Sequence, residues 1–177
     1  MKTILFLLLG MALQAAAPED PVGTTPPEWA VEEWINSPPL KLSDLRGKVV
    51  LVRWWTGPQC SFCTDSAPVL QGWWNGLRER GLVVAGMYHH KASTPLDRAH
   101  VEAQVKRLGF TFPVATDPGW RTLRAWWLEG RKRDFTSVSF LIGRDGKIAH
   151  VHSGGTIDPA DERGKALAAA ITAALGK

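Results

Sequence analysis

This chain has few cysteines and no clusters of basic residues, and each shortage excludes a class of protein. Cysteine occurs only twice among the 177 residues, and neither copy lies near the N-terminal apolar segment, which excludes a lipid-attached cysteine there. Lys and Arg total 21 against 17 Asp and Glu, and they are scattered rather than grouped, so nucleic-acid binding is not expected. No internal repeat is visible. With 45% hydrophobic residues, the chain suits a single compact domain.

Residues 1–17 have the composition of a secretory signal peptide. Lys2 precedes an apolar run from Ile4 to Leu13, and the small residues Ala15–Ala17 follow. An uncleaved membrane anchor is the less favoured alternative, because the run is short for a full span. The sequence therefore predicts export to the periplasm or another extracytoplasmic compartment, where a disulfide persists. The cleavage site stays open, because cleavage after Ala17 would leave a proline first.

The rest of the chain is predicted to comprise a proline-rich leader, residues 18–28, and one α/β domain, residues 29–177. The apolar run Lys48–Trp55 predicts a strand covered on both faces. Apolar residues at helical spacing then predict a helix that starts near Cys60 and that Gly81 ends. Similar patterns predict further elements: strands at Trp29–Ile35 and Gly81–Tyr88, helices at Pro95–Leu108 and Trp120–Leu128, a hairpin of residues 136–142 and 147–151, and a last helix with Asp158 as N-cap and Pro159 as its first residue.

The two cysteines form a C-x-x-C motif, Cys60-Ser61-Phe62-Cys63, directly after the predicted buried strand. Such a motif at the start of a helix is suited to opening and closing one small disulfide ring. Cys60 would lie at the helix N-terminus, where unpaired N–H groups favour a thiolate, so it is the expected nucleophile. Cys63, almost one turn further along, is the expected resolving residue.

Three segments together carry a family resemblance: Pro39–Val52, the C-x-x-C motif with Pro68, and Phe140–Gly146. In this order they resemble the extracytoplasmic TlpA-like and redoxin (AhpC/TSA-like) thiol–disulfide oxidoreductases, over roughly Trp29 to Leu175. The resemblance implies a thioredoxin-like three-layer α/β fold, in which helices flank a central mixed β-sheet. It also implies protein thiols and disulfides as partners, with no cofactor. Whether a membrane-bound reductant regenerates the dithiol is left open.

The chain departs from this family pattern beside the cysteines. Where such proteins have a cis-proline three residues before the hairpin phenylalanine, this chain has Ser137, and we expect a trans peptide there. Where they keep a buried acid, Arg53 or Ser66 stands here, and Asp65 is expected to point outward. An arginine close to the sulfurs would favour the thiolate. The residues expected to line the site are Arg53, Trp55, Pro58, Ser61, Phe62 and Ser137.

Other interpretations of the two cysteines remain. A static disulfide is disfavoured because so short a ring constrains little of the unfolded chain. A zinc site would need histidines, but the five histidines show no recognised ligand spacing. A peroxiredoxin-like thiol peroxidase would need a threonine three residues before its reactive cysteine and an arginine opposite, where Gly57 and Ser137 stand. A copper-binding module would use both thiolates and a histidine.

Overall fold

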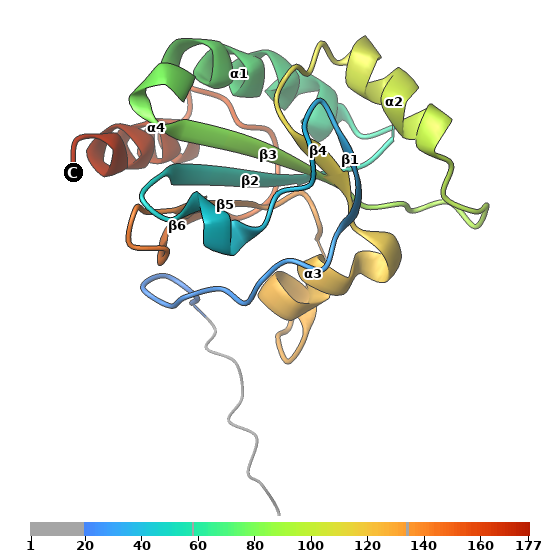
Figure 1. Ribbon diagram of the computed structural model, residues 1–177, viewed down its shortest axis with the longest axis horizontal. Coiled ribbons are helices and arrows are strands. Elements are labelled where there is room, and N and C mark those ends of the chain that lie inside the picture. Colours follow the sequence, from blue (N-terminus) through green and yellow to red (C-terminus); the bar gives the residue numbers. More distant parts are fainter. Residues whose placement is uncertain (1–19, 58, 134) are drawn as a thin grey trace, which may run out of the picture.

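The computed structural model describes residues 20–57, 59–133 and 135–177, which contain a six-stranded sheet of order β1-β4-β3-β2-β5-β6 (Figure 1). β2 and β3, and likewise β3 and β4, are parallel, whereas the other three pairs are antiparallel. The sheet is therefore mixed. The strands are, in chain order, β1 (Glu32–Ile35), β2 (Val49–Trp55), β3 (Leu82–Tyr88), β4 (Val114–Thr116), β5 (Ser139–Ile142) and β6 (Ile148–His152).

The central strand β2 is buried at all seven of its residues. Its side chains alternate between the two faces of the sheet, so that Leu51 joins one core cluster and Val52 the other. Successive β-branched and aromatic residues suit such a doubly covered strand. The prediction of a strand covered on both faces over Lys48–Trp55 is confirmed.

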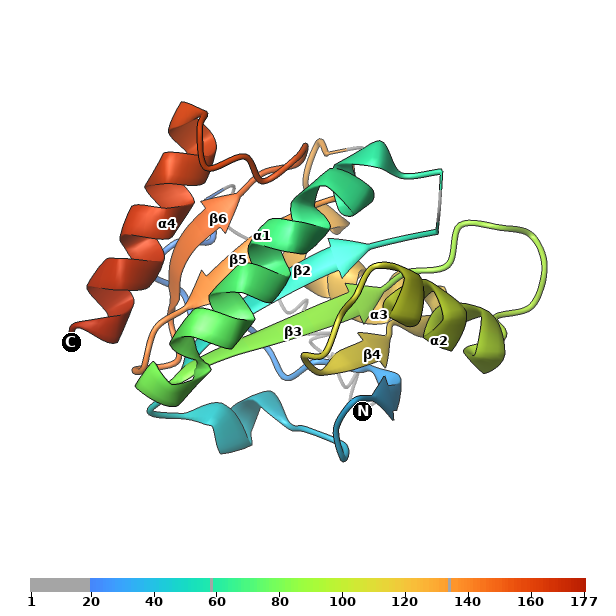
Figure 2. The ribbon, with the colours of Figure 1, turned by 90° about the horizontal axis from the view of Figure 1, so that it is seen from above.

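Helices cover both faces of the sheet. One face carries α1 (Ser61–Leu77), α2 (Arg98–Arg107) and α4 (Glu162–Leu175), as Figures 1 and 2 show. The other face carries α3 (Arg121–Leu123) and the π-helical turn Arg124–Leu128 that continues it. The three-layer α/β arrangement expected from the sequence is confirmed.

The prediction that Asp158 caps the last helix is wrong. α4 begins at Glu162, and its N-cap is Asp161, whose carboxylate accepts a hydrogen bond of 2.6 Å from the N–H of Gly164. Asp158 closes the preceding turn instead, because its carbonyl oxygen accepts from the N–H of Asp161. The Asp-Pro pair marks a turn here, and the second aspartate of the segment starts the helix.

Two further elements differ from the sequence expectation for local reasons. α2 starts at Arg98, three residues later than predicted, because the carboxylate of Asp97 caps it by accepting from the N–H of Ala99 at 3.0 Å. β4 is only three residues long, which is too short for any alternating pattern to predict it.

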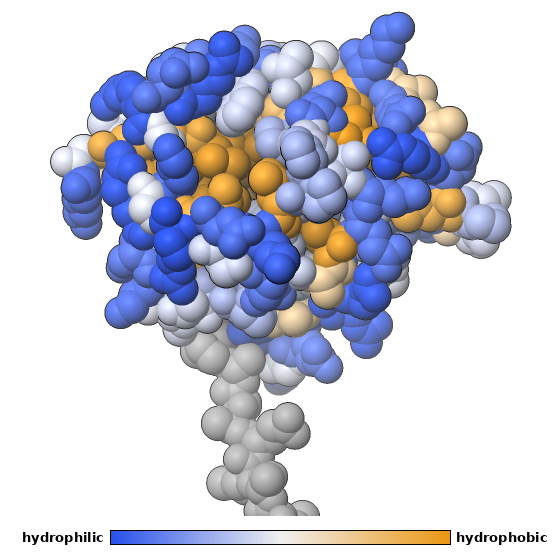
Figure 3. Space-filling view, viewed as in Figure 1, coloured by the Kyte–Doolittle hydropathy of each residue, from blue (hydrophilic) through white to orange (hydrophobic). Residues whose placement is uncertain are grey.

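The described leader residues pair with β6 at the edge of the sheet. The N–H of Gly23 donates to the carbonyl of Ile148 at 2.8 Å, and the N–H of Ile148 donates to the carbonyl of Thr24 at 2.9 Å. The signal-peptide prediction for residues 1–17 lies outside the described residues. Within residues 20–57, 59–133 and 135–177, no helix combines the length and hydrophobicity needed to cross a membrane. On the face drawn in Figure 3, hydrophilic side chains surround smaller areas of hydrophobic residues.

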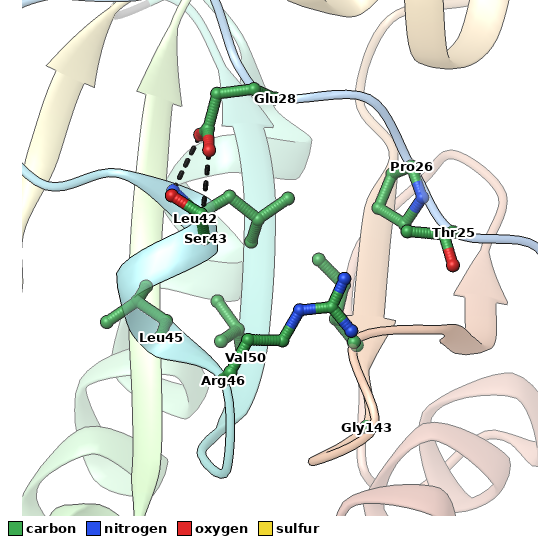
Figure 4. A pocket seen from close by; sticks show the side chains of 11 residues that line it. Thr25, Pro26, Glu28, Leu42, Ser43, Leu45, Arg46, Val50 and Gly143 are labelled. Carbon is green, nitrogen blue, oxygen red and sulfur yellow. Dashed lines mark hydrogen bonds between the residues drawn. The ribbon is translucent and has the colours of Figure 1, made fainter.

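The residues around a pocket between the leader and the start of β2 make contacts that hold the fold together (Figure 4). The Glu28 carboxylate accepts hydrogen bonds from the N–H groups of Leu42 at 2.6 Å and Ser43 at 3.0 Å, and so caps the 3-10 helix Leu42–Leu45. Arg46 donates to the carbonyl of Asp145. These polar groups therefore hold the leader and the β5–β6 turn at the end of β2 that lies away from the cysteines.

A substitution at Gly164 tests how closely α4 packs against the segment before it. A Cβ added there would overlap the carbonyl of Asp158, which is backbone and cannot rotate away. We therefore expect Gly164→Ala to lower the free energy of unfolding by about 2 kcal/mol, although alanine normally favours a helix over glycine. The matched control is Gly72→Ala in α1, where the added Cβ meets no atom within 4 Å. The control should gain up to about 1 kcal/mol in urea unfolding; equal effects of both variants would contradict the packing of α4.

Candidate active site

The C-x-x-C motif lies where β2 runs into α1. β2 ends at Trp55, a short loop follows, and Cys60 is the N-cap of α1, with extended backbone angles. Cys60 and Cys63 form a disulfide, with their Cα atoms 5.3 Å apart. The N–H of Cys63 donates to Sγ of Cys60 at 3.2 Å. Cys60 therefore lies at the positive end of the helix, where unpaired N–H groups stabilise a negative charge on sulfur.

The two sulfurs differ in exposure. Cys60 is partly exposed, whereas Cys63 is 3% exposed and packs in the core cluster under α1. An incoming group therefore reaches Cys60 more easily than Cys63. This difference fits the predicted roles of Cys60 as nucleophile and Cys63 as resolving residue, which remain predictions.

A pocket of about 490 Å³ opens beside the disulfide, and we call it the disulfide pocket. Two of its side chains, Phe62 at 50% exposure and Phe135 at 39%, are among the three large hydrophobic residues that the described part of the chain exposes. An exposed aromatic pair beside a reactive sulfur is suited to contact with another molecule. The pocket is lined by Thr56, Gln59, Cys60, Ser61, Phe62, Cys63, His89, Lys91, Phe135, Thr136 and Ser137.

The structure distributes the predicted neighbours of the cysteines differently. Ser61, Phe62 and Ser137 line the disulfide pocket. Trp55 belongs to the core, where its ring packs 5.0 Å from Tyr88 between centroids, and it lies in the same cluster as Cys63. Pro58 lies outside the described residues.

Ser137 is held by hydrogen bonds on both sides. Its hydroxyl accepts from the N–H of Gly155 at 3.2 Å, and its carbonyl accepts from Nη1 of Arg53 at 3.0 Å. No cis peptide occurs among the described residues, so the trans peptide expected at Ser137 is confirmed. The segment opposite the disulfide is thus fixed by polar bonds to β2 and to the loop after β6.

No carboxylate lines the disulfide pocket among the described residues. Ser66 is fully buried, and its hydroxyl donates to the carbonyl of Phe62 at 2.6 Å and accepts from the N–H of Ile157 at 2.8 Å. Asp65 is exposed, as expected. Ser66 therefore joins α1 to the segment before α4, and no acid side chain lines the pocket among the described residues.

His89 and Thr136 are pocket residues that were not among those predicted to line the site. Nε2 of His89 lies 2.9 Å from the hydroxyl of Thr136, and its Nδ1 is buried with no hydrogen-bond partner. His89 follows β3 directly, and β3 is parallel to β2. Functional sites in such sheets lie at the carboxyl ends of the parallel strands. The position of His89 directly after β3 is therefore the sequence signal that could have identified it.

Burial controls the ionisation of two histidines on or near the site. Burial, with help from the charge of Lys91, lowers the pKa of His89 from 6.5 to about 3. Burial, with help from the charge of Arg53, lowers the pKa of His152 from 6.5 to about 4. Both ring nitrogens of His152 are buried without a partner. Both side chains are therefore neutral near pH 7.

Within the described residues no group of three His, Cys, Asp or Glu side chains lies close enough together to hold a metal ion. Cys60, Cys63 and His89 all line the disulfide pocket, yet these described residues do not form such a group.

The buried histidines make stability depend on pH. The unfolded chain binds protons near pH 6.5 and the folded chain only near pH 3 to 4, so stability is complete above about pH 6.5 and is lost as the pH falls. We expect urea unfolding to show a loss of up to about 2 kcal/mol per histidine between pH 7 and pH 5. His89→Gln should remove about half of this dependence, and the control His100→Gln, at an exposed position on α2, should leave it unchanged. An unchanged slope in His89→Gln would contradict the buried neutral histidine.

Known proteins are similar to this chain in sequence. The AhpC/TSA family model matches residues 22–151. Protein DipZ of Mycobacterium tuberculosis is 30% identical over 142 residues, which are 78% of this chain and 20% of DipZ, so the chain spans about a fifth of that relative. The thiol-disulfide oxidoreductase ResA of Bacillus subtilis is 25% identical over 132 residues, which are 75% of this chain and 67% of ResA.

A solved structure with the same fold is that of a candidate thiol:disulfide interchange protein DsbE from Chlorobium tepidum. It superposes with a TM-score of 0.68 at 28% identity, over 88% of this chain and 98% of that one. The thioredoxin-like fold and the resemblance to redoxins are confirmed, and similarity to thiol–disulfide oxidoreductases supports an oxidoreductase. Because the family model covers most of its length, the chain belongs to the AhpC/TSA family.

Proposed function

We propose that this protein is an extracytoplasmic thiol–disulfide oxidoreductase that exchanges the Cys60–Cys63 disulfide with thiols of partner proteins. The observation that carries the proposal is the disulfide itself, placed at the N-terminus of α1 with one sulfur reachable from an open pocket. Similarity to ResA and to the DsbE structure supports the same chemistry.

The exchange proceeds through a mixed disulfide. A partner thiolate attacks Sγ of Cys60, the Cys60–Cys63 bond breaks, and Cys63 leaves with the electron pair and takes up a proton. The partner's second thiol then loses its proton and attacks the partner sulfur of the mixed disulfide, so that Cys60 leaves as a thiolate. Two electrons pass to the cysteine pair, and the partner gains one disulfide.

The same atoms run the reaction in reverse. The Cys60 thiolate attacks a partner disulfide, and the Cys63 thiolate then attacks Cys60 and releases the reduced partner. The N–H of Cys63, 3.2 Å from Sγ of Cys60, and the helix N-terminus stabilise the negative sulfur in both directions.

A protein, rather than a small thiol, fits the surface around the sulfurs. Phe62 and Phe135 expose large apolar area next to Cys60, and contact with a partner's apolar side chain would bury it. The Phe62 ring comes from α1 and the Phe135 ring from the loop before β5, so an extended segment between them would contact both.

The competing peroxidase lacks its expected threonine, although Thr56 lies one residue earlier and lines the disulfide pocket. Gly57 stands three residues before Cys60, where a hydroxyl would have to hold the peroxide, and it has no side chain to do so. Membership of the AhpC/TSA family does not supply this group.

Replacing the resolving cysteine tests the exchange. In Cys63→Ser the mixed disulfide on Cys60 has no internal thiol to resolve it, so we expect partners to accumulate as adducts that dithiothreitol releases. The variant would be expressed with its whole sequence in the native host and the adducts counted on non-reducing gels. Cys60→Ser is the matched control and should trap at least tenfold fewer. Equal or absent adducts in both variants would contradict exchange through Cys60.

Export is tested separately. We expect residues 1–28 fused to alkaline phosphatase, which is active only where its disulfides form, to give activity in a bacterial host. A fusion that begins at residue 18 should lack that activity. Activity from both fusions, or from neither, would contradict export by residues 1–17.

A further inference from the structure

Arg53 is a buried cation with no carboxylate partner among the described residues. Its side chain is on β2 and the residue is 1% exposed. The guanidinium donates to the carbonyls of Ser137 at 3.0 Å and Gly155 at 2.8 Å, and to the hydroxyl of Ser139 at 3.3 Å. Its Nε has no partner, and none of the ion pairs within the described residues includes Arg53. A buried charge without a counter-charge is expensive, so an anion nearby would stabilise it.

This cation lies on the side of the sheet that α1 covers. Leu51 and Trp55, the neighbours of Arg53 on the same face of β2, pack in one cluster with Cys63. The carbonyl that Arg53 binds at Ser137 belongs to a residue of the disulfide pocket. The charge of Arg53 also lowers the pKa of His89, another pocket residue. The field of Arg53 therefore reaches the space in front of the sulfurs.

Among its described residues, the disulfide pocket carries positive charge without a carboxylate to balance it. Lys91 is the one cationic residue among the described residues that line the pocket, and these residues include no Asp or Glu; Arg53, which was predicted to line the site, is not among them. Asp65, the acid nearest to the cysteines in sequence, is exposed. Burial, together with the positive charge of Arg163, lowers the pKa of Arg53 from 12.5 to about 9, so Arg163 adds positive charge near Arg53. A neutral disulfide supplies no negative charge to Arg53 or Lys91.

We propose that the thiolate of the reduced pair is the counter-charge of Arg53, so that Arg53 favours the dithiol form and makes the protein an acceptor of electrons from partner thiols. This inference rests on the proposed exchange function and adds its direction. Arg53 acts through space and through Ser137, so it is a positioning residue and not a reacting group.

The electrons and protons of the reaction explain why a nearby cation favours the reduced form of the cysteine pair. A partner dithiol gives two electrons and becomes a disulfide, while the Cys60–Cys63 bond breaks. Of the two partner protons, one stays on Cys63 and one goes to solvent, because Cys60 remains a thiolate. The product thus carries one negative charge that the starting disulfide lacks. A nearby fixed cation stabilises only the reduced form, and stabilisation of the reduced form defines an oxidant.

Two variants at the same position separate charge from packing. Arg53→Gln removes the charge but keeps an amide that donates hydrogen bonds. Arg53→Lys keeps the charge but loses the planar guanidinium group with its several N–H donors. Each variant is equilibrated at pH 7 with mixtures of reduced and oxidised glutathione, and the reduced fraction is measured by thiol alkylation and mass spectrometry. Lys147→Gln, at the β5–β6 turn on the opposite end of the sheet, controls for net charge.

We expect Arg53→Gln to shift the equilibrium at least tenfold toward the disulfide, a fall in potential of about 30 mV. Arg53→Lys and Lys147→Gln should stay within about threefold of the parent protein. Equal shifts in Arg53→Gln and Arg53→Lys, or no shift in Arg53→Gln, would overturn the inference while leaving exchange intact. A parent protein whose pair never equilibrates with glutathione would instead overturn the proposed function.

A measurement on the unaltered protein tests the inference even if a variant does not fold. In the reduced parent, the rate of Cys60 alkylation by iodoacetamide should already have levelled off by pH 7, because the thiolate is formed below that pH. A rate that keeps rising tenfold per pH unit up to pH 8 would contradict a stabilising cation.

Discussion

The placement of the redox pair depends on the complete burial of β2. A strand covered on both faces has no freedom to slide or tilt, and here two tryptophans fix its end. The indole N–H of Trp54 donates to the buried Asp117 carboxylate at 2.9 Å on one face, and Trp55 packs against Tyr88 on the other. The chain therefore leaves the sheet at a fixed point, and α1 begins with Cys60 at its N-terminus. The reactivity of the sulfur follows from that geometry.

The same strand carries the charge that distinguishes this site. Arg53 occupies a buried position of β2, where Gly86 and Ser139 are its register partners on the neighbouring strands. It holds Ser137 opposite the disulfide, where a proline would otherwise fix the chain by its ring. One buried guanidinium thus both orders the segment that faces the sulfurs and sets the electrostatic field around them.

Local patterns in the sequence predict the elements that carry the chemistry. The apolar run of β2, the C-x-x-C motif after it and the Asp-Gly turn of the hairpin each specify their structure within a few residues. The polar network is different, because Arg53, Ser137 and Gly155 are far apart in sequence and meet only through sheet register and loop packing. The choice of Asp161 over Asp158 as the cap of α4 likewise depends on the turn that precedes the helix. Long-range contacts of this kind leave no periodic signal to recognise.

The measurement that tests the account most directly is disulfide transfer to an unfolded, fully reduced protein in the absence of any other oxidant. Mixed in equal amounts, the oxidised protein should pass its Cys60–Cys63 disulfide to the substrate within minutes, with one substrate disulfide formed for each pair reduced. A pair that stays oxidised over hours beside a large excess of substrate thiols would contradict the account.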